Sequence, residues 1–392
     1  MAAAKLHLDL LDPELYRTNP HDLWTQLRHD EPVYHDEQND LWALTRHKDV
    51  LEAERNAAVF SSAGAYRANA GPGESNMIAH DDPRHAQQRR LVLGRFTPAA
   101  MRKKEGEMQE LVDELLDAVA GAGRMEVVED LAGQLPSRLT ARMIGFPEEE
   151  WPTVKSWSER LMRIDDRRTS SSLEGLMSAS VELYQRVMVE APARRGCPMD
   201  DLLTVWSTAE IDGEELPIDT IFHEAGLFVS GGAETTRTLI SHGLRAFVDH
   251  PDQWELLASD PSLVPSAVEE MLRWVTPLNN MFRTVLSDTE IGGQALPAGA
   301  RVMLLYPSAN RDESVFADPF TFDVRRSPNP HLAFGNGTHF CLGATLARQL
   351  LKLLFTSLTS RFTDLQVLSE PDVEPNLFAR AVRTFELGFT VR

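Results

Sequence analysis

The residues best suited to chemistry lie in a glycine-rich stretch near the end of the chain, Asn329–Arg348. Its cysteine, Cys341, follows Gly335 and Gly337 and precedes Gly343, so the backbone around the thiol can approach another group closely. Leucines at helical spacing follow, which predicts that Cys341 lies at the start of a helix. Backbone N–H groups and the helix dipole there favour a thiolate. A lone cysteine before a helix is more often a small buried apolar residue, but the sequence on both sides argues against that interpretation.

The stretch matches the pattern Phe-Gly-x-Gly-x-His-x-Cys-x-Gly-x-x-Leu-Ala at every fixed position. It resembles the heme-ligand loop of the cytochrome P450 family. The resemblance implies that Cys341 is the axial thiolate ligand of a heme b iron, and that Phe334, His339 and Gly343 belong to the heme-binding site. A thiolate ligand pushes electron density onto the iron and favours cleavage of the O–O bond.

The longest helical pattern, 217–249, is unusual at its centre, Ser230-Gly-Gly-Ala-Glu-Thr-Thr236. Two glycines inside a helix together cost on the order of 2 kcal/mol relative to alanine, which indicates close approach of a flat ligand or a local break. Tight packing of small residues would explain the glycines alone, but not the acid and the hydroxyls after them. The segment resembles the oxygen-activation motif of the P450 family, with Glu234 as the acid and Thr235 as the alcohol that manage protons. Gly231, four residues before Thr235, lies on the same helix face.

Four basic residues stand where the resemblance implies contacts with the heme propionates. His85 and Arg89 are four residues apart on a helix expected to begin at Asp82-Pro83, which puts them on one face. A planar guanidinium is well suited to a charge-assisted contact with a carboxylate. Arg283 and His339 stand at the positions of further propionate partners.

Glu270-Met-Leu-Arg273 would by itself predict a surface ion pair that contributes little to stability. It resembles the Glu-x-x-Arg of the P450 family, which pairs with an arginine after a later Phe-Asp; the matching residue here is Arg326. We expect these three residues to be structural and to support the proximal side of the heme.

The other patterns predict a mainly helical chain with small β-sheets. Helices are expected at 21–32, 48–59, 98–122, 131–144, 199–207 and 265–274, with two more within 148–195; Asp219 is expected to cap the long helix. Strands are expected at 33–35, 41–45, 281–285, 289–291, 301–305, 365–368 and 385–391.

The resemblance implies one cytochrome P450 domain over 1–392, with the heme buried between the long central helix and the Cys341 loop. It makes 61–80 a substrate-gating loop; we further expect a mobile lid at 165–172 and a tip over the cavity at 376–379.

Composition restricts the partners and the compartment. The net charge of −20 disfavours nucleic acids and anionic membranes, and no apolar run approaches the ~20 residues of a membrane span. The two cysteines, Cys197 and Cys341, form no disulfide framework, which favours a reducing cytoplasm. One segment, 83–104, carries seven Lys or Arg residues and no acid, so it is either a solvated basic face or a docking patch for an acidic protein.

The resemblance implies a soluble bacterial-type monooxygenase, a monomer by default. It would insert one atom of O2 into an unactivated C–H bond with electrons from a ferredoxin and its reductase. Three alternatives remain: a peroxygenase or isomerase without a redox partner, a hydrolase with a cysteine nucleophile, and a heme sensor or carrier. The Glu234-Thr235 pair argues against the peroxygenase and the sensor, and a hydrolase would leave the other motifs unexplained.

The substrate is the least specified part of the prediction. Three segments resemble those of actinobacterial P450s that oxidise sterol side chains: Glu269–Trp274, Asn280-Met281 with Arg283, and Ser308–Asp312. These segments are mainly scaffold, so terpenoids, fatty acids and polyketides remain open as substrates.

Overall fold

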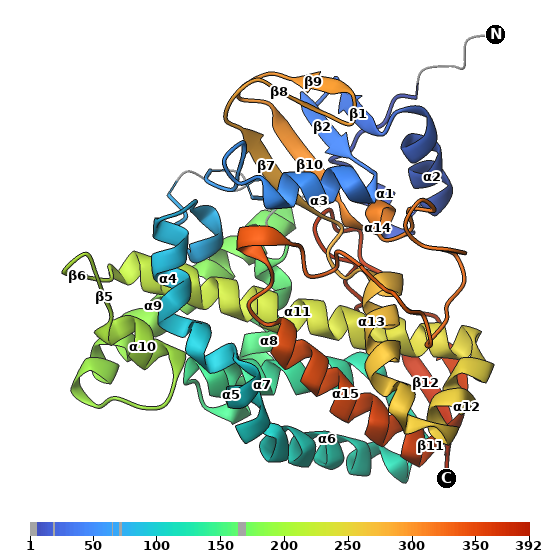
Figure 1. Cartoon of the computed structure of the whole chain (residues 1–392). Helices are drawn as coiled ribbons and strands as arrows, with labels where there is room; N and C mark the ends of the chain where they lie inside the picture. Colours follow the sequence, from blue (N-terminus) through green and yellow to red (C-terminus); the bar gives the residue numbers. More distant parts are fainter. Residues whose placement is uncertain (1–5, 19, 65, 70–72, 164–169) are drawn as a thin grey trace.

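The computed structural model describes residues 6–18, 20–64, 66–69, 73–163 and 170–392 of the chain. Its longest helix, α11 (Ile218–Asp249), crosses the middle of the molecule, with helices around it and a β-rich region above them (Figure 1). The helix is continuous through Gly231 and Gly232, so the local break that the sequence allowed does not occur there. The prediction that Asp219 caps this helix was wrong. Pro217 occupies the N-cap position, and Asp219 lies in the first turn, where its charge suits the helix dipole.

The β-rich region is a five-stranded sheet built from distant parts of the chain. Its strands are β1 (Val33–Asp36), β2 (Leu41–Leu44), β3 (Phe60–Ser61), β7 (Asn280–Val285) and β10 (Arg301–Leu305). Their order is β1-β2-β10-β7-β3, with β10 parallel to β2 and the other neighbours antiparallel. Helix α3 (His47–Arg55) leaves β2 and directs its last turn at the segment before Cys341. The sheet therefore brings Arg283 of β7 close to the end of α3.

The remaining elements form the helical body and three small sheets. The helices are α1 (Glu14–Arg17), α2 (His21–Asp30), α4 (Arg84–Leu93), α5 (Pro98–Lys103), α6 (Glu105–Ala120), α7 (Gln134–Ile144), α8 (Trp151–Leu161), α9 (Ser170–Gly196), α10 (Leu202–Thr208), α12 (Pro251–Ser259), α13 (Val264–Val275), α14 (Tyr306–Ala309) and α15 (Ala344–Arg361). The strands are β4 (Arg124–Glu126), β11 (Phe362–Ser369) and β12 (Glu386–Val391) in one sheet, the hairpin of β5 (Glu210–Ile211) and β6 (Glu214–Glu215), and the hairpin of β8 (Thr289–Ile291) and β9 (Gln294–Leu296).

Several predicted helices differ from the observed ones. The helix expected at 48–59 ends at Arg55, and the one expected at 199–207 begins at Leu202. The helix expected over 98–122 is divided at Lys104, whose backbone leaves the helical region. The helix expected to begin at Leu131 instead follows a π-helical turn, Val127–Ala132. Pro136 lies in the first turn of α7 and lacks the N–H that a continuous helix from Leu131 would use.

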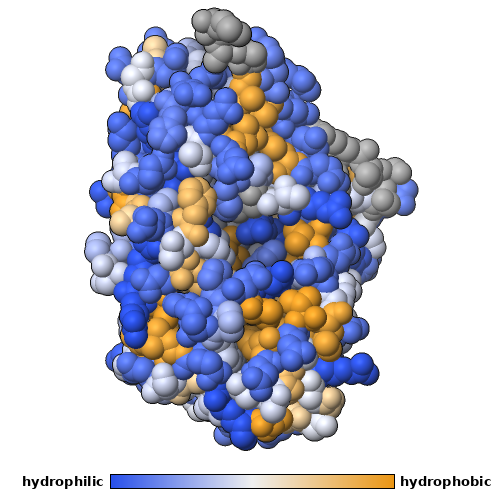
Figure 2. Space-filling view, turned by 90° about the vertical axis from the view of Figure 1, so that its right-hand side faces the viewer, coloured by the Kyte–Doolittle hydropathy of each residue, from blue (hydrophilic) through white to orange (hydrophobic). Residues whose placement is uncertain are grey.

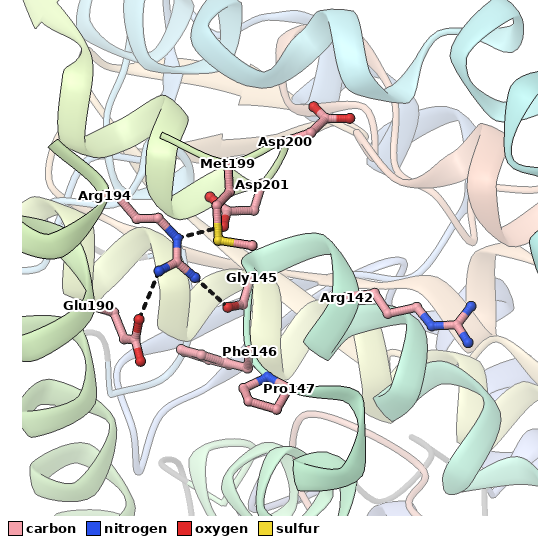
Figure 3. A pocket seen from close by; sticks show the side chains of 9 residues that line it. All are labelled: Arg142, Gly145, Phe146, Pro147, Glu190, Arg194, Met199, Asp200 and Asp201. Carbon is pink, nitrogen blue, oxygen red and sulfur yellow. Dashed lines mark hydrogen bonds and ion pairs between the residues drawn. The ribbon is translucent and has the colours of Figure 1, made fainter. Parts of the chain in front are cut away.

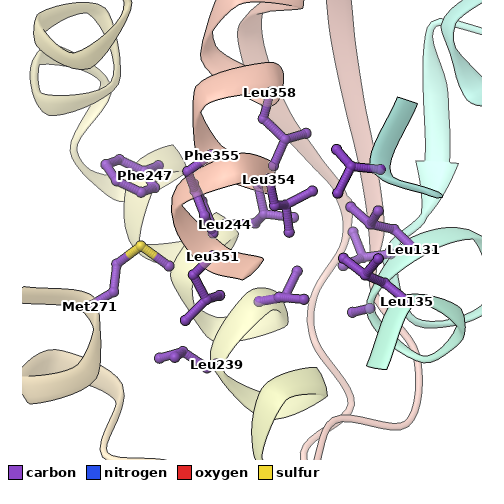
Figure 4. Close-up of a cluster of buried hydrophobic side chains, with 14 of the residues drawn as sticks. Leu131, Leu135, Leu239, Leu244, Phe247, Met271, Leu351, Leu354, Phe355 and Leu358 are labelled. Carbon is purple, nitrogen blue, oxygen red and sulfur yellow. The ribbon is translucent and has the colours of Figure 1, made fainter. Parts of the chain in front are cut away.

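The largest hydrophobic core fixes α15 against α11 and α13 (Figure 4). It includes Leu351, Leu354, Phe355 and Leu358 of α15, Leu244 and Phe247 of α11, and Met271 of α13, all buried. Burial of each large apolar side chain stabilises the fold by about 1.5–3 kcal/mol. Because Cys341 lies just before α15, this core also fixes the position of the thiol.

Glu270 and Arg273 of α13 are completely buried, so they do not form a surface pair. Arg273 donates to both carboxylate oxygens of Glu270, at 2.8 and 2.7 Å, and Arg326 donates to the same carboxylate at 3.1 and 3.2 Å. Asn329, at the start of the Cys341 stretch, also donates to Glu270 at 3.1 Å. The three predicted residues therefore come together and hold this stretch against α13.

The face shown in Figure 2 is mostly polar, with apolar residues in separate patches. Within the described ranges, no helix has both the length and the apolar character needed to cross a membrane. Part of the expected lid, 165–169, lies outside the described residues, as do residues 65 and 70–72 of the expected gating loop. The segment 376–379 packs through Phe378 and Ala379 against Leu278 and Met281, two residues that line the cavity described next.

Candidate functional site

A cavity lies between α11, the Cys341 loop and the five-stranded sheet, and its lining is of two kinds. Polar groups come from Glu54, Arg89, Arg283, Tyr306, His339 and Cys341. Apolar groups come from Met77, Ile78, Leu227, Phe228, Leu278 and Met281. A site of this kind can hold a ligand that carries charged groups at one edge, with space for a hydrophobic molecule beside it.

The thiol of Cys341 lies in this cavity, two residues before the N-cap of α15. The backbone N–H groups of Gly343 and Ala344 and the charge of Arg89 act to lower the pKa of the thiol, but burial is the larger effect and raises it. The expectation that the helix N-terminus alone favours a thiolate is therefore outweighed by burial. A metal ion that the sulfur binds would deprotonate it.

The loop before Cys341 is shaped by two glycines in left-handed conformations, Gly335 and Gly337, with φ of 64° and 66°. The Cys341 N–H donates to the carbonyl of Phe334 at 2.9 Å and closes the loop. A Cβ atom on Gly337 would lie 2.3 Å from the carbonyl oxygen of Glu54 in α3. The loop is therefore fitted to the last turn of α3.

His85, Arg89, Arg283 and His339, predicted to bind propionates, gather around this loop. The rings of His85 and His339 lie 4.3 Å apart, and Arg89 donates to the carbonyl of Phe340 at 2.7 Å. Within the described part of the chain, both ring nitrogens of His339 and Nε2 of His85 are buried without a hydrogen-bond partner. Buried polar groups are almost always paired, so these nitrogens indicate a missing polar ligand. The carboxylates of heme fit this requirement, and Cys341 in the same cavity fits the iron.

On α11, Gly231, Gly232 and Thr235 line the cavity, but the two glycines serve different purposes. A Cβ atom on Gly231 would meet open space, whereas one on Gly232 would lie 2.8 Å from Oγ1 of Thr140 in α7. Tight helix packing thus explains Gly232, and space in the cavity explains Gly231. The Thr235 hydroxyl donates to the Gly231 carbonyl at 2.9 Å, which leaves its lone pairs available to the cavity.

Glu234 is placed differently from Thr235. Its side chain is 1% exposed and accepts a hydrogen bond from Arg237 at 2.5 Å. Arg237 also pairs with Glu159 of α8, and Glu159 pairs with Lys155 at 3.0 Å. Burial raises the pKa of Glu234, and the charge of Arg237 opposes that shift. The carboxylate therefore begins a chain of charged groups that leads away from the cavity toward the surface.

Comparison with known proteins gives the same interpretation. The family model for cytochrome P450 matches residues 142–387. The chain belongs to the cytochrome P450 family. It is 42% identical to a steroid C26-monooxygenase of Mycobacterium tuberculosis over 327 residues, which cover 83% of this chain and 88% of the relative. It is 34% identical to the linalool 8-monooxygenase of Pseudomonas putida, over 92% of this chain and 94% of that one.

Solved P450 structures share the whole architecture. A Mycobacterium marinum cytochrome P450 in complex with pseudoionone superposes with a TM-score of 0.91 at 33% identity, over 99% of this chain and 100% of that one. A Bacillus megaterium P450 in complex with testosterone gives a TM-score of 0.88 at 30% identity, over 95% and 98%. The predicted fold class is therefore confirmed, and the family makes heme b the cofactor of this P450.

Three side chains of the site were not found from the sequence. Glu54 and Tyr306 line the cavity beside Arg283, and Arg237 holds Glu234. The spacing of residues along the sequence could have identified two of them, Glu54 and Arg237. Glu54 lies four residues after the buried Val50, on the inner face of α3, and Arg237 lies three residues after Glu234 on one helix.

A second hollow of the P450 lies at the surface around Phe146 and Arg194 (Figure 3). The Arg194 guanidinium donates to Asp201 at 2.7 Å, to Glu190 at 2.9 Å and to the Gly145 carbonyl at 2.7 Å. Its charged groups are thus already paired, and the hollow is better explained as a packing feature than as a binding site.

Proposed function

We propose that this P450 hydroxylates an unactivated C–H bond of a hydrophobic small molecule, with a sterol or steroid side chain as the preferred substrate. Membership of the family makes the chain a monooxygenase that uses O2 and a redox partner. The main support for a hydrophobic substrate is the apolar wall of the cavity. This wall is formed by α11, by the segment before α4 and by the segment around Met281. Each Å² of apolar surface buried there stabilises the complex by roughly 25 cal/mol.

The residues of the site take distinct roles in this proposal. Cys341 would hold the iron, with Phe334 and Gly343 shaping the loop around it, and the four basic residues would hold the propionates. When bound, heme supplies the activation of dioxygen and the transfer of one oxygen atom to the substrate. Gly231 leaves room beside α11, and Thr235 offers a hydroxyl for hydrogen bonding inside the cavity. Glu234 can deliver protons there only after it separates from Arg237.

Two kinds of substrate are favoured by the relatives. The steroid C26-monooxygenases support a sterol side chain, at up to 42% identity. The linalool 8-monooxygenase, at 34%, supports a terpenoid as the second candidate. Fatty acids and polyketides fit the same apolar wall but have less support.

We propose a ferredoxin, reduced by its reductase, as the electron donor. Arg90, Arg102 and Lys103 are exposed on α4 and α5. Helix α4 bonds to the Cys341 loop through Arg89 and the Phe340 carbonyl, and α5 packs against α15, which follows Cys341. Two other basic residues are less available than the sequence suggested: Arg89 turns inward to Phe340, and Arg348 pairs with Glu269 at 2.7 Å. A peroxygenase independent of a partner is the alternative, and the retained Glu234-Thr235 pair disfavours it.

The proposed function is tested in two steps on the purified holoenzyme. The reduced carbon monoxide complex should show the strongly red-shifted Soret band of thiolate ligation, and Cys341→His should lose both this band and turnover. Titration with cholesterol, linalool and a long-chain fatty acid should then shift the Soret band most strongly for the sterol, with a C26-hydroxylated product. Turnover by Cys341→His at the wild-type rate would refute the ligand assignment, and tighter binding of linalool would favour the second candidate.

A further inference from the structure

Glu54 of α3 is a buried carboxylate in the part of the cavity where the propionates would bind. Its side chain is 1% exposed, and it lines the same cavity as Arg283, His339 and Cys341. Oε2 accepts a hydrogen bond from Arg283 at 3.1 Å, and Oε1 accepts one from the Tyr306 hydroxyl. Arg283 and Tyr306 lie 229 and 252 positions after Glu54 in the sequence.

Arg283 thus differs from Arg89 and His339 at this site, whereas His85, like Arg283, lies beside an acid, Asp82, at 3.3 Å. Its Nη2 is directed at Glu54 and its Nη1 donates to the carbonyl of Phe282 at 2.7 Å, so its charge is already compensated. By contrast, His339 has no hydrogen-bond partner for its ring in the described part of the protein. A carboxylate arriving at Arg283 would share that guanidinium with Glu54.

Tyr306 keeps the Glu54 carboxylate in its place. Burial and the charge of Glu54 raise the pKa of the Tyr306 phenol well above its usual value, so the phenol stays protonated and remains a donor. The backbone N–H of Asn336 points at the same carboxylate from 3.4 Å. Glu54 is therefore fixed from three sides: β7, α14 and the loop before Cys341.

Resting on the proposed function, in which heme occupies this cavity, we propose that Glu54 is a positioning residue for the cofactor. It holds Arg283 and compensates its charge, so the adjacent propionate and the iron experience a more negative field than the four basic residues alone would create. A buried negative charge stabilises the oxidised, more positive iron, and interactions in a low-dielectric interior are strong. Glu54 thus lowers the reduction potential of the heme.

The test is a spectroelectrochemical titration of the purified holoenzyme with four substitutions. Glu54→Gln removes the charge but keeps the size, and its midpoint potential should shift to a more positive value. Glu54→Asp keeps the charge and should stay close to wild type, and Tyr306→Phe, which changes no charge, should give a smaller shift than Glu54→Gln. Glu374→Gln is the matched control, because Glu374 is a buried glutamate that pairs with Arg163 and Arg383 and does not line the cavity.

Heme retention, measured by transfer to apomyoglobin, separates this role from a purely structural one. Glu54→Gln frees Arg283 for the propionate and should retain heme at least as well as wild type. Faster heme loss, an unchanged potential, or equal shifts in the Asp and Gln variants would overturn the proposal. A wild-type protein without the red-shifted carbon monoxide band would instead refute the proposed function itself.

Discussion

Nη2 of Arg237 lies 2.5 Å from Oε1 of Glu234, one helical turn earlier in α11, and this bond directs the carboxylate away from the cavity that Thr235 lines. The acid and the alcohol of the motif are therefore adjacent in sequence but face different surroundings. A proton can pass between them only if the ion pair opens. Because Arg237 also binds Glu159, opening requires a change at α8 as well.

This arrangement predicts the effect of neutralising Glu234. Glu234→Gln should slow product formation on the order of 10²-fold, because general acid–base groups contribute about 10²–10⁴-fold. It should also enlarge the solvent isotope effect, since proton delivery becomes limiting. Glu159→Gln is the control: it removes the outer partner of Arg237 but keeps the acid, so turnover should persist. An unchanged rate and isotope effect in Glu234→Gln would show that the acid serves only as an ion-pair partner.

Removal of the Thr235 hydroxyl should uncouple electron use from product formation. Thr235→Ala should keep consuming reducing equivalents and release hydrogen peroxide, with the yield of product per electron pair several-fold lower. The melting temperature should change little, because the lost bond lies within one helix turn. Thr235→Ser, which keeps a hydroxyl, should restore much of the coupling. Unaltered coupling in the alanine variant would count decisively against a role in proton management.

The basic residues around His339 predict how tightly heme is held. Arg89→Ala should lose a charged hydrogen bond of about 1.5–3 kcal/mol, so heme should transfer to apomyoglobin on the order of ten- to a hundredfold faster. Arg90→Ala is a matched control, because Arg90 is exposed and, among the described residues, bonds only to the Ala86 carbonyl of its own helix. Equal transfer rates for the two variants would mean that Arg89 contacts no propionate.

The exposed basic residues predict how the electron donor binds. If an acidic ferredoxin docks at α4 and α5, its reduction of this P450 should slow steeply with salt, because the Debye length falls from ~10 Å at 0.1 M to ~3 Å at 1 M. Arg90→Glu and Arg102→Glu should slow reduction further without changing substrate affinity. Arg124→Glu, at the exposed first position of β4, makes the same change of net charge elsewhere and should have little effect. Stopped-flow rates that respond equally to all three substitutions would refute a defined docking face.

Glu224 predicts a pH dependence of stability. Burial raises its pKa from 4.5 to about 8, although the Met77 N–H bonds to it at 2.8 Å and opposes the shift. Between these values the folded protein keeps a proton that the unfolded chain releases. The stabilisation is therefore complete below about pH 4.5 and decreases as the pH rises toward 8, by up to about 1.4 kcal/mol per pH unit.

Urea unfolding of wild type and Glu224→Gln at about pH 5.5 and about pH 7.5 measures this contribution. The difference between the two proteins matters, because other groups also titrate. The wild type should lose more stability than the variant between these two pH values. Parallel decreases in both proteins would show that Glu224 is ionised in the fold.

The elements with strong local signals could be predicted from the sequence. Helix α11 begins one residue after its predicted start and ends at Asp249 as predicted, because its helical pattern is long and Pro251 follows it. The buried group of Glu270, Arg273 and Arg326 was found only through the family resemblance, since an i,i+3 pair alone suggests an exposed contact. Local pattern also failed at Lys104, where a single residue divides the helix.

The residues of the site that could not be predicted from the sequence depend on contacts between distant segments. Nothing near Glu54 in the sequence shows that its partner is Arg283, because the sheet that joins them combines strands from both ends of the chain. The different roles of Gly231 and Gly232 could not be predicted from the sequence either, because only the position of Thr140 in α7 distinguishes the two glycines.

The close approach of Gly337 to the Glu54 carbonyl shows that part of the cysteine-loop pattern is needed for packing between segments of the chain. A side chain at Gly337 would collide with the backbone of α3, and one at Gly335 would come within 3.3 Å of the Glu54 carboxylate. Two of the eight fixed residues of that pattern therefore record close packing between the Cys341 loop and α3. A variant that altered the end of α3 would displace the loop of Cys341, the proposed iron ligand, without touching any residue of that pattern.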